Sequence, residues 1–168
     1  MGFDLTGLDP TINTEHSQEY NDILKLYGKD GWLDWSMDIP ETTKHRYFEL
    51  QDQFRNNNPG SYFRNNVWWW RPLWQCIGSA CDDILSEDDI TGGYYNDGYK
   101  ISKEQAVGIA ERMKSLIDND TIKDYKLEYD KSINELPEDD FMRSYSFTVE
   151  NLQKFISFCE SSGGFEIW

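Results

Sequence analysis

The residues with the strongest capacity for chemistry lie in the stretch SYFRNNVWWWRPLW, residues 61–74. Tryptophan rings offer flat faces on which a base can stack, and each such stack contributes about 1–3 kcal/mol. An arginine guanidinium grips a phosphate or a carboxylate through paired N–H donors, and asparagine amides can hydrogen-bond base edges or ribose hydroxyls. We therefore predict that a nucleotide-like anion is held by Tyr62, Arg64, Asn66, Trp68, Trp70 and Arg71.

Charge is segregated around this stretch. The chain has a formal net charge of −15, yet the segment from Gln53 to Cys81 has no aspartate or glutamate and contains Arg55, Arg64 and Arg71. A strongly acidic surface repels nucleic-acid phosphates, so direct DNA or RNA binding is disfavoured. The pattern favours a small anionic ligand at the acid-free segment, or a protein partner with a basic groove.

Two other interpretations of the tryptophan segment stay open. Tryptophans are usually core residues, and neighbouring arginines usually stack on them as structural cation–π pairs. Tryptophan and arginine are also the typical anchors of protein interfaces. The oligomeric state stays open too, a homo-oligomer included.

Catalytic and metal-binding signatures are missing from the sequence. His16 and His45 stand in polar helical stretches without a nucleophile motif, and the acidic run at 82–89 lacks the ligand spacing of a calcium loop. The three cysteines form no C-x-x-C pair. We predict no catalytic residue, metal or cofactor. A small hydrolase or nuclease remains a third alternative, which requires a histidine to meet carboxylates or Cys81 in a cleft.

Helical periodicity and capping residues predict most of the elements that must position these side chains. Ser102 with Gln105 forms a capping box, Thr148 caps the last helix, and Pro137 ends the one between them. Outside the tryptophan segment we predict helices over residues 14–27, 40 to about 59, 102–117, 121–136 and 148–162.

Pro72 decides the expected geometry of the tryptophan segment. A proline inside a helix costs about 3 kcal/mol, so a helix that begins at Pro72 is favoured, with residues 65–71 extended or irregular. In that geometry Trp69 enters the core while Trp68 and Trp70 point elsewhere. The alternative is a helix that Asn66 caps and that continues through Pro72 with a kink.

Short apolar alternations predict a small amount of β structure. The stretches GFDLTG and GFEIW, at the two ends of the chain, can pair as a ribbon, and Asn96–Gly98 between tyrosine-rich arms indicates a hairpin. Residues 29–39 are predicted to be a loop with buried aromatic side chains. The fold expected is mainly α (α+β), a single compact domain over residues 1–168 with about five or six helices. No apolar stretch is long enough to cross a membrane, and no membrane partner is predicted.

Four stretches together resemble a family of small bacteriophage-encoded proteins of uncharacterised activity: MGFDLTGLDPTINTE, NPGSYFRNNVWWWRPLW, YYNDGYKIS and FCESSGGFEIW. The resemblance implies a viral accessory protein in the host cytoplasm, of a kind that often binds components of host defence. Some members carry zinc-knuckle cysteine pairs before the last helix. The corresponding stretch here, NELPEDDFMRSYSF, has no cysteine, so no zinc role transfers.

Together these observations predict a non-enzymatic counter-defence protein that holds a nucleotide-like ligand, such as an immune signal molecule, through the arginine- and tryptophan-rich segment. The first alternative is an acidic inhibitor that mimics DNA and occupies a basic groove on a host defence protein.

Overall fold

The computed structural model describes residues 2–168, which form two compact units. The smaller unit is Ile12–Asn58, and the larger unit comprises Pro59–Trp168 with the N-terminal residues up to Thr11. Helices predominate and a small antiparallel sheet accompanies them, which confirms the predicted mainly α (α+β) class. The prediction of one domain over the whole chain stays a prediction.

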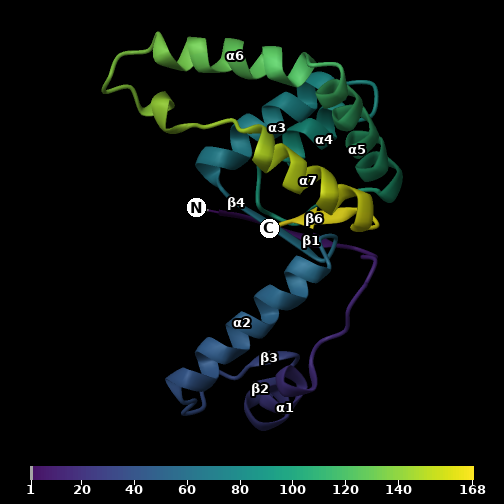
Figure 1. The fold of residues 1–168 in the computed structure, drawn as a ribbon, viewed down its shortest axis with the longest axis vertical. Helices are drawn as coiled ribbons and strands as arrows, with labels where there is room; N and C mark the ends of the chain where they lie inside the picture. The colour runs from purple at the N-terminus through teal and green to yellow at the C-terminus, as the bar shows by residue number, and fades with distance from the viewer. Residues whose placement is uncertain (1) are drawn as a thin grey trace. The chain divides into compact units, whose positions relative to one another are not determined.

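The sheet of the larger unit has the strand order β4-β1-β6-β5, with all neighbours antiparallel. Its strands are β1 (Gly2–Gly7), β4 (Tyr62–Asn66), β5 (Tyr99–Ile101) and β6 (Phe165–Ile167) (Figure 1). Leu5 lies opposite Ile167, so the predicted pairing of the two terminal segments is confirmed. Apolar side chains alternate along the strands, so one face of the sheet is buried.

The predicted hairpin around Asn96–Gly98 is wrong, because only its second arm is a strand. The amides of Tyr94 and Tyr95 donate to Thr91 O and Gly92 O and so continue the turn after α4 (Glu87–Gly92). β5 pairs instead with β6, at the other end of the chain.

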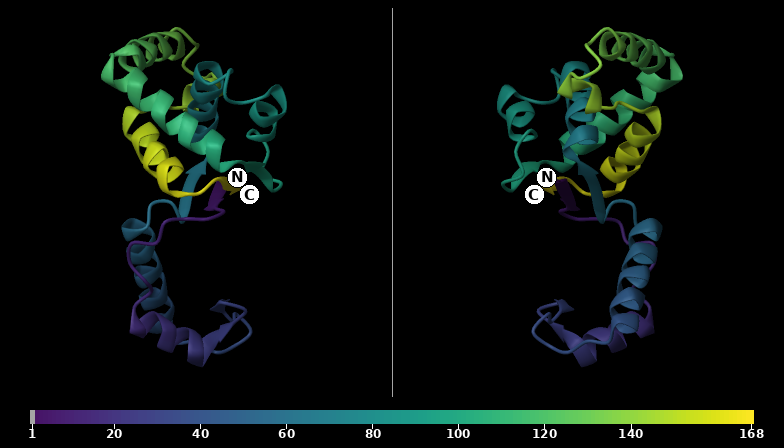
Figure 2. Two further views of the ribbon diagram at one scale, coloured as in Figure 1. Left: turned by 90° about the vertical axis from the view of Figure 1, so that its right-hand side faces the viewer. Right: turned by 90° about the vertical axis from the view of Figure 1, so that its left-hand side faces the viewer.

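The described part of the larger unit contains five α-helices and one short 3-10 helix. Besides α4 they are α3 (Val67–Ala80), α5 (Lys103–Asp118), α6 (Thr121–Asn134), η1 (Phe141–Ser144) and α7 (Val149–Ser161). Helices α3, α4 and α7 contact strands of the sheet, whereas α6 lies farther from it, against α5 and α7 (Figure 2). The predicted caps of α5 and α7 are confirmed, since Ser102 Oγ accepts from Gln105 N and Thr148 Oγ1 accepts from Asn151 N.

In residues 2–168, no helix combines the length and the apolar character needed to span a bilayer.

Helix α3 corrects the favoured interpretation of Pro72. The helix begins at Val67, is capped by Asn66, and contains Pro72 in its interior. A proline has no N–H to donate to the carbonyl four residues earlier, which here is that of Trp68. Ser146 N donates to Trp68 O at 3.0 Å instead. This tertiary hydrogen bond replaces the missing helical one. The expected cost of a proline inside a helix considers the helix alone and does not include such a bond.

The smaller unit consists of α1 (Gln18–Tyr27), a hairpin of β2 (Gly28–Lys29) and β3 (Trp32–Leu33), and α2 (Glu41–Asn57). Both predicted helices are confirmed, although Ser17 rather than Thr14 begins the first. Their apolar faces share a small core whose buried members are Tyr20, Leu33, Ile39, Tyr47 and Leu50.

The interpretation of residues 29–39 as a loop with buried aromatics is wrong. Asp30 and Gly31 adopt positive φ angles of 53° and 85°, as a two-residue type I′ turn requires, and they connect β2 to β3. Trp32 and Trp35 are each 61% exposed.

Candidate functional site

A cavity of about 390 Å³ lies beside Arg71 in the larger unit. Small-molecule sites usually have volumes of roughly 300–1,000 Å³ and combine apolar walls with a few polar groups. The lining side chains come from α3, α6, η1 and two connecting segments: Arg71, Pro72, Gln75, Tyr94, Tyr129, Ser132, Ile133, Met142 and Tyr145.

Two buried indoles fix the rotation of α3 and so place Arg71. Trp70 and Trp74 have no exposed surface, and their rings stack at a centroid distance of 5.2 Å. Trp70 Nε1 donates to Gly93 O at 2.7 Å, and Trp74 Nε1 donates to Ile90 O at 2.8 Å. Buried indole N–H groups need such partners. Because both rings are held, Arg71 projects from the helix at the cavity.

The guanidinium of Arg71 is exposed and donates to Tyr145 Oη at 3.2 Å. In the part of the chain that the structure describes, Arg71 forms no ion pair, whereas Arg46 and Arg112 each contact a carboxylate. An arginine has five N–H donors, so most of those on Arg71 remain free for an anionic ligand.

Three tyrosines line the cavity together with Arg71. Tyr129 Oη donates to the backbone oxygen of Tyr145 at 3.3 Å, and Tyr145 is nearly buried. Burial raises the pKa of Tyr94 against the opposing effect of Arg71, and burial also raises the pKa of Tyr129. Both hydroxyls are therefore neutral near pH 7. The cavity offers one positive charge, neutral hydroxyls and flat ring surfaces.

Among the six predicted site residues, Arg71 lines this cavity and Trp68 supports its wall. The Trp68 ring packs edge-on against Phe141 and Tyr145, with centroid distances of 4.7 and 5.1 Å. The expectation that Trp70 stays outside the core is wrong: its ring contacts Phe3, Trp74 and Phe155 and has no exposed face for a ligand.

The remaining three predicted residues have structural contacts and do not line the cavity. Tyr62 Oη donates to a carboxylate oxygen of Asp4, and Arg64 Nε lies 3.5 Å from the same carboxylate. Asn66 Oδ1 accepts from Trp69 N at 3.1 Å and so caps α3. Sequence reasoning missed Tyr94, Tyr129 and Tyr145, because nothing local marks three distant tyrosines as neighbours.

The side chains considered for catalysis lie in unsuitable surroundings. His16 stacks between Tyr20 and Phe54, and His45 is exposed on α2. Burial raises the pKa of Cys76 to about 12 and that of Cys81 to about 11, which disfavours the thiolate that a nucleophile requires. Within residues 2–168, no group of three or more histidine, cysteine, aspartate or glutamate side chains is arranged to hold a metal ion.

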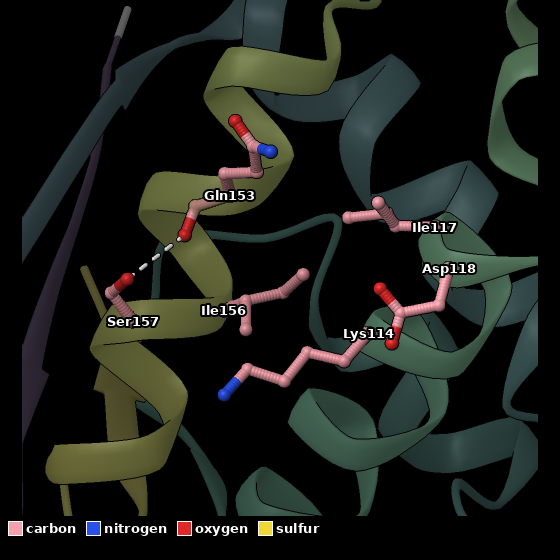
Figure 3. Close-up of a pocket in the computed structure, with 6 residues that line it drawn as sticks. All are labelled: Lys114, Ile117, Asp118, Gln153, Ile156 and Ser157. Carbon is pink, nitrogen blue, oxygen red and sulfur yellow. Dashed lines mark hydrogen bonds between the residues drawn. The ribbon is translucent and has the colours of Figure 1, made fainter.

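A second cavity, of about 280 Å³, lies between α5 and α7 (Figure 3). Two of its polar side chains are already engaged: Lys114 pairs with Glu160, and Ser157 Oγ donates to Gln153 O at 3.1 Å. Among the described lining residues, the other charged group is the carboxylate of Asp118. This cavity therefore has fewer free groups that could bind an anion than the cavity beside Arg71.

Comparison with known proteins gives no relative from which a role could be transferred. No protein-family model matches the chain, and no curated protein or solved structure is significantly similar to it.

Proposed function

We propose that this protein is a non-enzymatic binding protein that holds a nucleotide-like small anion in the cavity beside Arg71. The observation that carries the proposal is an arginine that has no carboxylate partner among residues 2–168, at a tyrosine-lined cavity, in a chain of net charge −15. Surface arginines in so acidic a protein readily find carboxylates, so an arginine that faces a cavity without one is available to a ligand.

The lining residues suggest how such a ligand lies. Its phosphate or carboxylate sits on the Arg71 guanidinium, which Tyr145 Oη orients. Its ring packs against Tyr94 and Tyr129, whose hydroxyls can bond ribose or base atoms. Trp68 acts indirectly, by packing behind Tyr145. This arrangement modifies the expectation from the sequence, since the tyrosines replace Trp68 and Trp70 as the stacking surface.

Sequestration requires no chemistry beyond binding. A phage-encoded protein in the host cytoplasm would lower the free concentration of a nucleotide immune signal simply by holding it. The resemblance to small phage proteins supports this biological role, and the cavity supports the class of ligand.

Isothermal titration calorimetry against a panel of cyclic and ADP-ribose-derived nucleotides tests the proposal. We expect at least one member to bind, and Arg71→Gln to weaken its Kd by about tenfold or more, because hydrogen bonds to charged groups contribute about 1.5–3 kcal/mol. The matched control is Arg64→Gln, which removes an exposed arginine of the same acid-free segment outside the cavity. Absence of binding throughout the panel, or an equal loss in the control, contradicts the proposal.

Salt dependence separates this function from the DNA-mimic alternative. The acidic surface repels an approaching anion, so added salt should raise the association rate of a nucleotide ligand. A DNA mimic bound to a basic groove should instead bind its partner more weakly as salt is added. Stopped-flow measurements at several salt concentrations distinguish the two.

A further inference from the structure

The smaller unit exposes a group of large apolar side chains that we call the aromatic edge: Trp32, Trp35, Met37 and Phe48. Trp32 and Trp35 are each 61% exposed, and Met37 and Phe48 are each 44% exposed. The unit already has a core of its own in Tyr20, Leu33, Ile39, Tyr47 and Leu50. The aromatic edge is therefore additional to what the fold of this unit uses.

Two of these side chains are in contact, and the other two lie near Trp35 along the chain. Trp35 stacks on Phe48 with ring centroids 6.2 Å apart and planes at 21°. Trp32 and Met37 lie three and two residues from Trp35, which limits the Cα separations to about 11 and about 7 Å. In Figure 1 the chain continues from β3, beside α1, toward the first turn of α2, which carries Phe48 further along.

The backbone that carries the aromatic edge is fixed before any partner binds. The Asp30–Gly31 turn sets the β2–β3 hairpin, and Asp34 N donates to Tyr27 O at 2.8 Å. Asp34 also accepts from the backbone and side chain of Ser36, at 2.9 and 2.6 Å. A preorganised surface loses little conformational freedom on binding, which favours affinity. Exposed tryptophans on such a surface are typical anchors of protein interfaces.

Carboxylates outnumber basic groups beside the aromatic edge, where Lys29 lies opposite Trp32 across the hairpin. Asp30 and Asp38 are exposed and Asp34 is half-buried, and none of the three forms an ion pair with a lysine or arginine of residues 2–168. Guanidinium and ammonium groups are attracted both to such carboxylates and to the faces of tryptophan rings. The exposed indoles and the nearby carboxylates therefore favour a partner in which arginine or lysine residues flank an apolar side chain.

The same charges argue against other occupants. A second copy of this chain would bring like-charged carboxylates together across the contact, and each copy carries −15. An anionic lipid surface would be repelled in the same way.

We propose that the aromatic edge is a docking surface for a basic segment of a protein partner. An apolar side chain of the partner packs between Trp35 and its neighbours, while flanking arginines stack on the indoles and pair with Asp30, Asp34 and Asp38. The surface belongs to the smaller unit and the cavity beside Arg71 belongs to the larger one. The two proposals can therefore fail independently.

Fluorescence anisotropy with a defined peptide tests this inference on the full chain. The probe is a short labelled peptide in which arginine alternates with leucine, and its counterpart has glutamate in place of arginine. We expect the arginine peptide alone to bind. Trp35→Ala should weaken its Kd by about tenfold or more, as loss of an interface anchor does. Asp38→Lys should also weaken binding, with a smaller salt dependence.

Matched variants separate docking from general attraction between a cationic peptide and an acidic protein. Trp168→Ala removes a tryptophan of similar exposure from the larger unit, and Glu138→Lys reverses an exposed charge there. Neither should change the Kd by more than about twofold. Trp32→Thr, which keeps a strand-forming residue, serves as a second variant, and circular dichroism verifies that each variant is folded.

Several outcomes overturn the inference. These are no binding of the arginine peptide, equal losses in the control variants, and equal binding of the glutamate peptide. Sedimentation that shows a dimer abolished by Trp35→Ala would assign the surface to a second copy instead. Binding to phosphatidylglycerol vesicles that Trp35→Ala abolishes, with peptide binding unchanged, would assign it to a membrane.

Discussion

His16 illustrates how single residues in this protein combine favourable packing with an electrostatic cost. Its ring stacks between Phe54 and Tyr20, with centroid distances of 3.7 and 4.0 Å. Its Nδ1 is buried and has no hydrogen-bond partner among residues 2–168. Burial lowers the pKa of His16 from its usual value of 6.5, against a smaller opposing effect of Glu15. The folded state therefore favours the neutral imidazole.

This arrangement predicts a pH dependence of stability. Below about pH 6.5 the unfolded chain binds a proton at His16 that the folded chain binds less readily, so the free energy of unfolding falls as pH falls. Arg46 lowers the pKa of Glu19 from 4.5, and Lys44 lowers that of Glu41 in the same way. Protonation of these two carboxylates therefore reduces the free energy of unfolding only at lower pH. Urea unfolding between pH 5 and 7 measures the slope.

Two variants identify the group responsible. His16→Phe keeps an aromatic ring in the stack and removes the titrating group, so the slope should flatten. His45→Gln removes the exposed histidine of α2 and should leave the slope unchanged. A slope that persists in His16→Phe would contradict the assignment.

At the same scale, the sequence could not tell which tryptophan is exposed. Consecutive residues in a helix are rotated by about 100°, so a change from strand to helix reassigns every side chain. Trp70 consequently enters the core, and Trp69, the residue expected there, is 38% exposed. Asn66 as a capping residue indicated the correct start of the helix. The free-energy cost of Pro72 inside a helix outweighed this signal when only neighbouring residues were considered.

Among the elements, α3 depends on a hydrogen bond from outside the helix. Ser146→Pro would remove the N–H that bonds Trp68 O. Tyr145, the preceding residue, has φ −78° and ψ 127°, a conformation compatible with a following proline. The variant should therefore lower the free energy of unfolding by about 1 kcal/mol, the net contribution of a typical hydrogen bond.

Controls distinguish this cost from other effects. Ser146→Ala retains the N–H and should change stability by less than about 0.5 kcal/mol. Adding Pro72→Ala to Ser146→Pro supplies a new N–H four residues from Trp68 and should recover part of the loss, as a double-mutant cycle measures. If Pro72→Ala is no better tolerated in that background, the two donors do not substitute for each other.

Elements with capping signals were the most predictable part of the fold. The caps at Ser102 and Thr148 act within three residues, so a single sequence contains the whole interaction. The two turns show the limit of local signals. Asp30–Gly31 forms a hairpin because two strand residues on each side pair, whereas the amides of Tyr94 and Tyr95 are already used by the end of α4.

For the molecule as a whole, the two units differ greatly in the size of their cores. Five buried hydrophobic residues hold the smaller unit together, while the core of the larger one draws on its sheet and on most of its helices. Small domains bury a lower fraction of their surface and are less stable. Native-state hydrogen exchange should therefore show faster exchange for the amides of α2 than for those of α5 and α7.

The same experiment examines the single-domain prediction. Equal protection in the two units would mean that they open together, and it would contradict the expected order of stability. Denaturant titrations followed by exchange provide the comparison at each amide.

The cavity beside Arg71 shows why the site was only partly predictable. Its lining comes from residues 71–75, 94, 129–133 and 142–145. The acid-free segment identified Arg71 through composition alone. The tyrosines become neighbours only when α6 and the segment after it fold back toward α3, an arrangement that no short-range pattern encodes.

The position of β6 in the sheet affects how the protein folds during synthesis. β1 and β6 are the two central strands, and Asp4 and Trp168 exchange backbone hydrogen bonds of 2.8 Å. Residues 12–58 form a compact unit, so the partners for the contacts within it are all present once this segment has left the ribosome. β1, although made first, must wait for residues 165–167 to emerge before its second neighbour exists. The earliest strand is thus completed last, and until then its apolar side chains depend on β4 and the nascent helices for protection from aggregation.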